Sequence, residues 1–260
     1  MIDVLVAAAA IVLPLRFEDG NVLVDASVDG NPVHLIVDTG GKGSLQLTAA
    51  AAARVGVKTD ASLVSRIDPY GNSYAGPGFA VGELEIAGAK FRNLRGFVRG
   101  EAASGATGSL PADGLLGMEF LRDYVARFDY AAKTLTLFTE DDPAEAGRAC
   151  AGSPVPVFSH PLRFWLTAMQ TDHGVFRAIL DSGATFSMIS SATAAAARLP
   201  LEDGLYRTTR LVLGTREAGP LDFVSVGLDV PGADALLGYN FFERHVLCLD
   251  GPRGTATIVS

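Results

Sequence analysis

The sequence has few of the residues on which many catalytic and metal-binding sites depend. Its 260 residues include only two cysteines and four histidines, so a four-cysteine metal site and a framework of several disulfides are both excluded. The histidines lack the paired helical spacing typical of zinc ligands. Acidic residues outnumber basic ones by 29 to 21, and no long Lys/Arg cluster occurs. This charge distribution argues against nucleic acid as a partner.

The two cysteines, Cys150 and Cys248, leave two interpretations open. One is a single disulfide that ties a mid-chain linker to the last hairpin, and the other is a pair of free thiols. We expect the thiols to be unpaired.

The start of the chain lacks basic residues, and its apolar run at residues 4–13 is too short to span a bilayer. Two interpretations are open here as well. Residues 1–10 are the remnant of a secretory signal, which favours a periplasmic or secreted protein. Alternatively, residues 11–15 form a first β-strand after an irregular lead-in, and a cytoplasmic location stays open.

The strongest feature that is present is an internal repeat. The segment IVDTG at residues 36–40 returns as ILDSG at residues 179–183, and GLLGMEFL at 114–121 returns as ALLGYNFF at 235–242. Each Asp motif follows a predicted apolar strand and precedes an alanine-rich segment headed by Thr48 or Ser190, which predicts a short capped helix. Each unit ends in a predicted hairpin, turned at residues 130–133 and 251–254.

The spacing of the repeats suggests how the chain is divided. The first unit is longer between its two motifs, and we place much of the extra loop in the Gly-, Ala- and Ser-rich residues 99–113. Residues 139–154 are polar and punctuated by Gly and Pro, which predicts a linker. We therefore expect an N-terminal unit at residues 1–142 and a C-terminal unit at residues 143–260.

A carboxylate at the tip of a strand, followed by a small hydroxyl residue and a glycine, has a clear physical logic. The glycine permits a tight turn and close backbone approach, and the hydroxyl can hydrogen-bond across to an opposing turn. If the two turns face each other, Asp38 and Asp181 meet and share one proton, because like charges at contact distance resist joint ionisation. Such a pair supplies the acid and the base for peptide hydrolysis without a metal, a cofactor, or a serine or cysteine nucleophile.

These paired motifs resemble the signatures of aspartic proteases. The chain is similar to bacterial retropepsin-like proteins in which two units are fused, as in the pepsins, and the resemblance covers nearly everything from residue 11 onward. It implies an all-β, bilobal acid-protease-like fold: two pseudo-twofold-related β-barrel lobes, a few short helices and an active cleft between the lobes. It also implies a peptide or protein substrate, and a monomer that suffices for activity because both units lie in one chain.

The resemblance assigns roles to particular residues. The apolar pair before each second-motif glycine should pack beneath the Asp turn, and a flap hairpin should cover the substrate about 30 residues beyond each Asp. The implied catalytic residues are Asp38 and Asp181, with Thr39, Gly40, Ser182 and Gly183 as dyad support and Tyr70, Gly71, Gly214 and Thr215 as flap residues.

Two departures from the family pattern stand beside these matches. Gly41 and Ala184 follow the two motifs where pepsins carry a hydroxyl residue, which should favour the neutral form of the acids. Lys42 has three possible roles: to lower the pKa of the nearby Asp, to bind a substrate carboxylate, or to point into solvent, which is the commonest outcome for a turn lysine. The predicted function is aspartic endopeptidase, and the alternative is a non-catalytic peptide- or partner-binding protein of the same fold.

Overall fold

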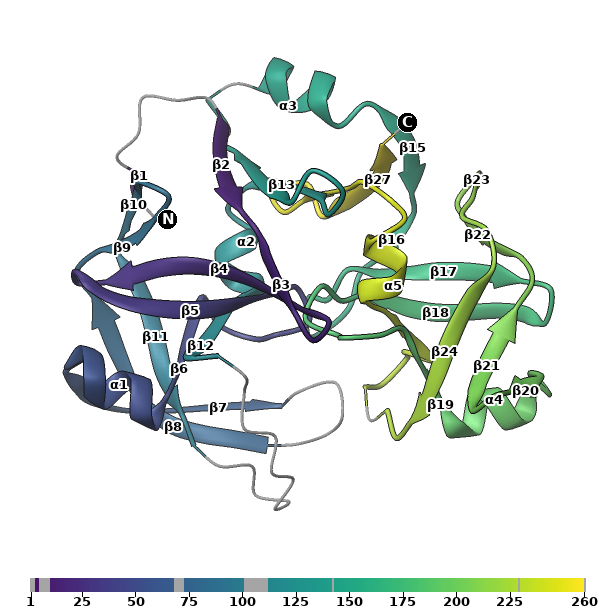
Figure 1. Cartoon of the computed structure of the whole chain (residues 1–260), viewed down its shortest axis with the longest axis horizontal. Helices are drawn as coiled ribbons and strands as arrows, with labels where there is room; N and C mark the ends of the chain where they lie inside the picture. The colour runs from purple at the N-terminus through teal and green to yellow at the C-terminus, as the bar shows by residue number, and fades with distance from the viewer. Residues whose placement is uncertain are drawn as a thin grey trace.

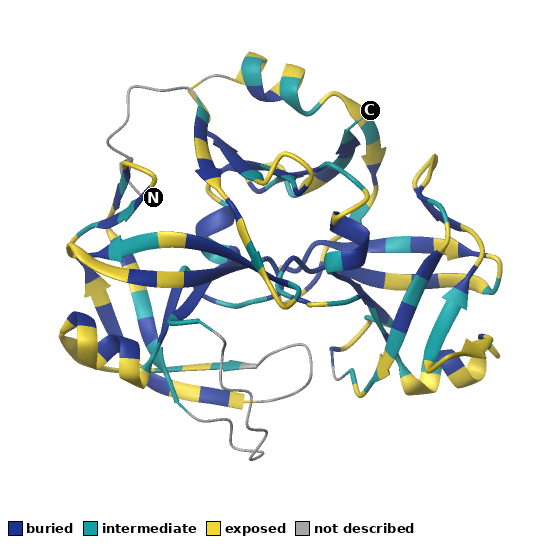
Figure 2. Ribbon diagram, viewed as in Figure 1, coloured by how far each residue is buried: buried dark blue, intermediate teal, exposed yellow. Residues whose placement is uncertain are grey.

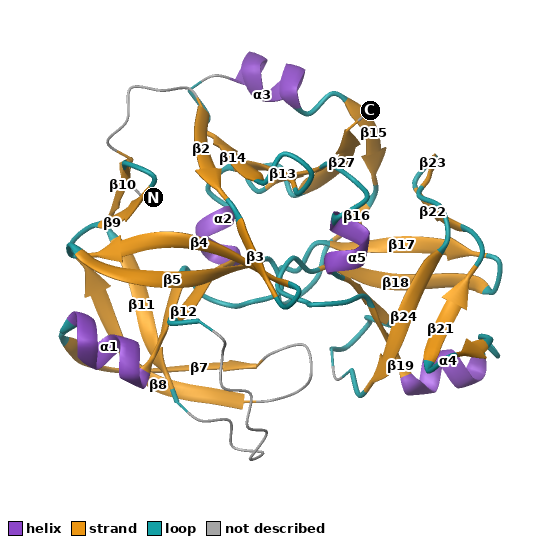
Figure 3. Ribbon diagram, in the orientation of Figure 1, coloured by secondary structure: helices purple, strands orange, loops and turns teal. Residues whose placement is uncertain are grey.

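The computed structural model describes residues 3–4, 10–67, 73–100, 112–141, 143–228 and 230–259. In this part of the chain, β-strands predominate and form three sheets, accompanied by five short helices (Figure 3). Two sheets form lobes that lie side by side, and the third bridges them (Figure 1). The predicted all-β, bilobal fold is confirmed.

The N-terminal lobe is built on a sheet whose inner strands, such as β12, are buried along their length. Its strand order is β1-β10-β9-β4-β5-β12-β6-β11-β8-β7, with β3 paired to β4. The strands are β1 (Asp3–Val4), β3 (Arg16–Glu18), β4 (Asn21–Val28), β5 (Asn31–Asp38), β6 (Leu45–Thr48), β7 (Thr59–Ile67), β8 (Ser73–Val81), β9 (Leu84–Ile86), β10 (Ala89–Arg92), β11 (Leu94–Arg99) and β12 (Gly114–Gly117).

The C-terminal lobe repeats this topology. Its order β20-β21-β24-β19-β25-β18-β17-β22-β23 matches β7-β8-β11-β6-β12-β5-β4-β9-β10 strand for strand, and β16 pairs with β17. In each lobe the strand of the Leu-Leu-Gly segment is parallel to the strand that leads into the Asp motif: β12 to β5, and β25 to β18. The strands are β16 (Val157–Phe158), β17 (Leu166–Thr171), β18 (Gly174–Leu180), β19 (Met188–Ser190), β20 (Leu201–Glu202), β21 (Leu205–Thr208), β22 (Leu211–Leu213), β23 (Arg216–Glu217), β24 (Leu221–Val226) and β25 (Ala235–Leu237).

The bridging sheet takes strands from both halves of the chain, in the order β15-β27-β26-β13-β14-β2. The two closing hairpins predicted from the repeat are β13–β14 and β26–β27, and they pair with each other through β13 and β26. The predicted first strand is also present, as β2 along one edge. The bounds are β2 (Ala10–Pro14), β13 (Val125–Asp129), β14 (Thr134–Phe138), β15 (Gly152–Val155), β26 (Leu247–Asp250) and β27 (Thr255–Val259).

The short helices begin where the sequence predicts them. Thr48 caps α1 (Ala49–Val55) and Ser190 caps α4 (Ser191–Ala196), each side chain accepting a backbone N–H of the first turn. Helices α2 (Met118–Leu121) and α5 (Tyr239–Phe242) follow the two Leu-Leu-Gly segments, and α3 (Pro143–Ala149) lies in the predicted linker. Among the described helices, none is long and apolar enough to cross a membrane.

The core runs continuously from one lobe to the other. Figure 2 shows buried positions gathered in the middle of the molecule and exposed ones toward its outer edges. Aromatic rings join the two halves there: Tyr130 stacks on Phe242 with centroids 5.5 Å apart, and both Tyr130 and Tyr239 contact Phe17 edge-on. Because such contacts stabilise the junction between the lobes, the two lobes pack as one body.

The extra length of the first unit lies mainly in a hairpin and not in residues 99–113. The β7–β8 hairpin extends from Thr59 to Val81, whereas its counterpart β20–β21 extends only from Leu201 to Thr208. The connection after β11 exceeds the one after β24 by only a few residues. The predicted site of the insertion is therefore wrong for most of the extra residues.

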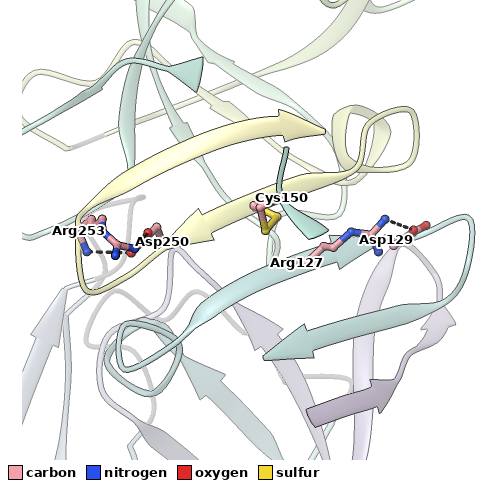
Figure 4. Close-up of a disulfide and its surroundings, with 6 residues drawn as sticks. Arg127, Asp129, Cys150, Asp250 and Arg253 are labelled. Atoms are coloured by element: carbon pink, nitrogen blue, oxygen red, sulfur yellow. Dashed lines mark hydrogen bonds and ion pairs between the residues drawn. A yellow bond between two sulfur atoms is a disulfide. The ribbon is translucent and has the colours of Figure 1, made fainter. Parts of the chain in front are cut away.

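The expectation of two free thiols is also wrong. Cys150, directly after α3, forms a disulfide with Cys248 on β26, with Cα atoms 5.7 Å apart (Figure 4). The spacing of 98 residues hides this pairing in the sequence. Folding brings the linker next to β26, an inner strand of the bridging sheet.

Candidate active site

Two equivalent turns bring the aspartates of the repeat together where the lobes meet. Asp38 is the last residue of β5, and Asp181 directly follows β18. The backbone N–H of Gly40 donates to Oδ1 of Asp38 at 2.8 Å, and that of Gly183 donates to Oδ1 of Asp181 at 2.9 Å. Each turn thus holds its own carboxylate in the same way.

The hydroxyl residues lock the two turns to each other. The Thr39 hydroxyl donates to the carbonyl oxygen of Leu180 at 2.7 Å and accepts the N–H of Ser182 at 2.8 Å. The Ser182 hydroxyl makes the equivalent bonds, to the carbonyl of Val37 at 2.8 Å and from the N–H of Thr39 at 3.1 Å. Both residues are fully buried. The predicted bracing across the two turns is therefore present as four reciprocal hydrogen bonds.

The glycine of each motif lies against the carboxylate of the other. A Cβ on Gly40 would lie 2.4 Å from Oδ2 of Asp181, and a Cβ on Gly183 would lie 2.4 Å from Cγ of Asp38. No side chain fits at either position. The glycine of each motif therefore allows the two carboxyl groups to approach each other closely, in addition to permitting the tight turn.

The surroundings of the two carboxyl groups are unequal. Burial raises the pKa of both above the ordinary value of an aspartate, and the negative charge of Asp38 raises the pKa of Asp181 further. The pKa of Asp38 is held down by the N–H groups of Gly41 and Gly40, by a hydrogen bond from Asp181, and by the charge of Arg99. Asp181 is only 4% exposed, while Asp38 is partly accessible. These directions favour Asp181 as the carboxyl group that carries a shared proton.

The Leu-Leu-Gly segments support the turns from below, as the resemblance implies. The leucines of both pairs are buried, and the backbone N–H after each glycine donates to the Asp loop, from Met118 to Gly41 and from Tyr239 to Ala184. The buried leucines are Leu115, Leu116, Leu236 and Leu237.

The second residue after the glycine of each Leu-Leu-Gly segment has a role that the sequence analysis does not predict. Glu119 accepts the backbone N–H of Gly43, and its counterpart Asn240 accepts that of Ser187 at 2.8 Å. The two residues occupy equivalent places in the aligned octapeptides, and both carry a side-chain oxygen, which is the signal that could have revealed them. They hold the far ends of the two Asp loops.

Lys42 does not point freely into solvent, which corrects the commonest expectation for a turn lysine. Its side chain is half-buried, and Nζ lies 4.3 Å from the ring centroid of Phe164 in the other lobe. Burial lowers the pKa of this amine to about 8, assisted by neighbouring arginines and opposed by Glu119.

The flap residues fall partly outside the described chain. Strands β7 and β8 form the expected antiparallel hairpin, with Ile67 paired to Ser73, but Tyr70 and Gly71 lie outside the described residues. Their contact with a substrate stays a prediction.

The second flap assignment is corrected by the pairing order. Gly214 and Thr215 form the turn of β22–β23, which corresponds to β9–β10 and not to the flap hairpin. A Cβ on Gly214 would meet Pro154 of the linker at 2.5 Å. The counterpart of the flap is β20–β21, turned at Asp203 and Gly204, which both have positive φ. The Asp-Gly pair is a hairpin signal in the sequence. It comes only 22 residues after Asp181, however, whereas the flap is expected about 30 residues beyond each Asp.

The fold and the site together define an aspartic-proteinase arrangement: two pseudo-symmetric lobes with one Asp-Thr/Ser-Gly turn from each. A family model described as "Aspartyl protease" matches residues 24–120. The aspartic proteinase of Irpex lacteus has the same fold, with a TM-score of 0.69, 15% sequence identity and 97% of each chain covered. No curated protein matches the sequence significantly. The resemblance to aspartic proteases is confirmed, and it supports protease activity in general terms.

Proposed function

We propose that the protein is an aspartic endopeptidase in which Asp38 and Asp181 activate a water molecule for attack on a peptide bond. The observation that carries the proposal is the reciprocal bracing of the two turns, which holds two buried carboxyl groups in hydrogen-bonding contact. A protein that used this junction only for binding would have no need to bury two acidic groups against each other, because removing them from water is unfavourable.

The unequal surroundings of the two carboxyl groups suggest which acts as the base and which as the acid. Asp38, ionised, takes a proton from the water as it attacks the scissile carbonyl carbon. Asp181, protonated, donates a hydrogen bond to the carbonyl oxygen. The roles then exchange, and the nitrogen of the leaving amine takes the proton as the carbon–nitrogen bond breaks. Both acids belong to one chain, so a monomer suffices in this mechanism, with a peptide or protein as substrate.

Cleavage profiling tests this proposal. A mixed peptide library is incubated with the wild type, Asp38→Asn and Asp181→Asn between about pH 3 and about pH 8, and new termini are identified by mass spectrometry. We expect cuts by the wild type, a loss of about 10²- to 10⁴-fold in each variant, and inhibition by a statine-type compound. If the wild type makes no cuts at any pH, the endopeptidase proposal fails. Peptide binding that persists in the variants would then favour the non-catalytic alternative.

We also propose a periplasmic or secreted location. The support is the Cys150–Cys248 disulfide, because such bonds persist in oxidising compartments and are rare in the cytosol. Thiol trapping of the protein in its native cells tests this. Alkylation of both cysteines without prior reduction would contradict the proposal.

A further inference from the structure

Five basic side chains gather beside the aspartate pair, although the chain as a whole has a net charge of -8. One of them lies near enough for its charge to act on Asp38, and three others surround the lysine of the Asp38 turn closely enough for their charges to act on its amine. These dyad-side cations are Lys42, Arg66, Arg99, Arg122 and Arg163. All except the exposed Arg163 are half-buried.

The dyad-side cations contrast with several basic residues elsewhere that form ion pairs with a carboxylate. Lys90 and Arg207, for comparison, form ion pairs with Glu83 at 2.6 Å and Asp222 at 2.7 Å. Within the described part of the chain, no ion pair includes any of the five. Glu119 is the nearby acid, and it is engaged with a backbone N–H of the Asp38 loop. Among the described residues, ion pairs therefore leave this local positive charge only partly balanced, by the charge of Glu119 on Lys42 and Arg122.

Aromatic rings hold four of these cations in place of carboxylates. A ring face attracts a cation while leaving most of its N–H groups available to an anion. The contacts, given as the distance from the charged centre to the ring centroid, are Lys42 on Phe164 at 4.3 Å, Arg66 on Phe97 at 5.9 Å, Arg99 on Tyr74 at 3.6 Å and Arg122 on Trp165 at 4.3 Å.

Gln46 links the Arg99 guanidinium to the backbone of the Asp38 turn. Its side chain is 3% exposed, donates from Nε2 to the carbonyl of Lys42 at 2.5 Å, and accepts from Nη1 of Arg99 at 3.3 Å. The Arg99 guanidinium is thus oriented by a stacked ring on one side and an amide on the other. Such preorganisation is what a binding site for an anion requires.

Gathering these cations has an electrostatic cost. Burial and the charges of the arginines lower the pKa of Lys42, which shows that the group repels itself. Arg99 is the cation whose charge lowers the pKa of Asp38, whereas the charges of Arg66, Arg122 and Arg163 lower the pKa of Lys42. An incoming carboxylate would offset this repulsion.

We infer that the dyad-side cations bind a carboxylate of the substrate next to the scissile bond, so that the enzyme prefers peptides with Asp or Glu near the cleavage site. This specificity rests on the proposed endopeptidase function. The same chemistry is present in a free carboxyl terminus, and the experiment below separates the two sources.

Matched peptides that differ only in Glu or Gln, placed at successive positions on either side of one scissile bond, test this inference. We expect the wild type to favour Glu over Gln at one or two adjacent positions by about tenfold in kcat/KM, mainly through KM. Arg99→Met and Lys42→Met should reduce this ratio to below about threefold, and Arg99→Lys should retain part of it. Arg95→Met is the matched control, because Arg95 lies on the same strand but is exposed and paired with Asp60. It should keep the wild-type ratio.

Salt and terminal amidation complete the design. The wild-type ratio should fall as ionic strength rises from about 0.05 M to about 0.5 M, which tests the charge even where a variant fails to fold. Comparing free and amidated peptide ends shows whether the bound carboxylate is a side chain or a chain terminus. A Glu-to-Gln ratio near one at every position, or one insensitive to both salt and Arg99→Met, overturns the inference while the peptides are still cut.

A failure of the protease function is distinguishable from a failure of this inference. If no peptide is cut, fluorescence anisotropy with the labelled Glu and Gln peptides shows whether the cations still bind a carboxylate. Tighter binding of the Glu peptide to the wild type, lost in Arg99→Met, supports the cation site without the protease. Equal binding of the two peptides overturns it.

Discussion

The hydroxyl of Thr39 makes two of the four bonds between the Asp turns, and its removal tests that bracing at the scale of one residue. Thr39→Val keeps the shape of the side chain but leaves the carbonyl of Leu180 and the N–H of Ser182 unpaired in a buried site. We expect the free energy of unfolding to fall by about 2–4 kcal/mol. Peptidase activity should fall as well, because the spacing of the carboxyl groups depends on these bonds.

Thr39→Ser is the matched control for this change. It retains the hydroxyl and loses only a methyl group, so it should remain within about 1.5 kcal/mol of the wild type. Urea denaturation and peptide-cleavage rates measure both effects. Equal stability of Thr39→Val and Thr39→Ser would show that the reciprocal bonds contribute little.

The shared proton of the dyad makes a second residue-scale prediction, on the pH dependence of stability. Because the pKa of Asp181 is raised in the folded protein, the native state binds this proton more tightly than the unfolded chain does. The stability of the wild type should therefore fall as pH rises from about 4, the unfolded value, toward the folded pKa.

Asp181→Asn removes the titration of that group and should flatten this part of the profile. Thermal melts at a series of pH values, for the wild type and the variant, provide the comparison. The effects of titratable groups outside the pair cancel to first order, because both proteins retain them. The titration of Asp38 is coupled to that of Asp181 and is part of the difference that is measured. A variant that loses as much stability as the wild type over the same pH range would contradict the proton assignment.

At the scale of elements, the contact between β12 and the Asp38 loop leaves no room for a side chain. A Cβ on Gly117 would lie 2.3 Å from the carbonyl oxygen of Gly43 and 2.9 Å from that of Gly41. Gly117→Ala should therefore displace the loop that follows Asp38 and cost about 1–3 kcal/mol of stability, with a larger loss of activity if the proposed function is correct.

Gly147→Ala provides the control, because Gly147 lies inside α3 with nothing within 4 Å of an added Cβ. It should be neutral or stabilising by up to about 1 kcal/mol, as expected for alanine in a helix. Denaturation curves and cleavage rates separate the two. Wild-type activity in Gly117→Ala would show that the loop does not rely on this contact.

The same elements show how far the sequence predicts the structure. The Asp turns, the capped helices and the closing hairpins were predictable, because each rests on a local signal that the chain repeats. The second flap and the insertion were misplaced because the order of strand pairing, on which they depend, is a property of the folded sheet. The position of Lys42 was missed for a related reason: its partner Phe164 lies in the other lobe.

At the scale of the whole molecule, the bridging sheet joins the two halves of the chain, and the aspartate pair exists only where the lobes meet. The Cys150–Cys248 bond closes a long loop between the linker and β26. Replacing both cysteines by serine should lower the free energy of unfolding by about 2–5 kcal/mol. Since the bonds between the Asp turns join the two halves, activity and folded structure should be lost in the same transition.

The measurement is a set of urea titrations followed both by circular dichroism and by residual peptide cleavage. Reduced wild type serves as the control and should coincide with the double-serine variant, because each lacks the bond and neither changes the site. The disulfide has no contact with the dyad, so activity in the absence of urea should be retained in both. If the two probes give separate midpoints, the lobes unfold independently and the junction contributes less to stability than its bonds suggest.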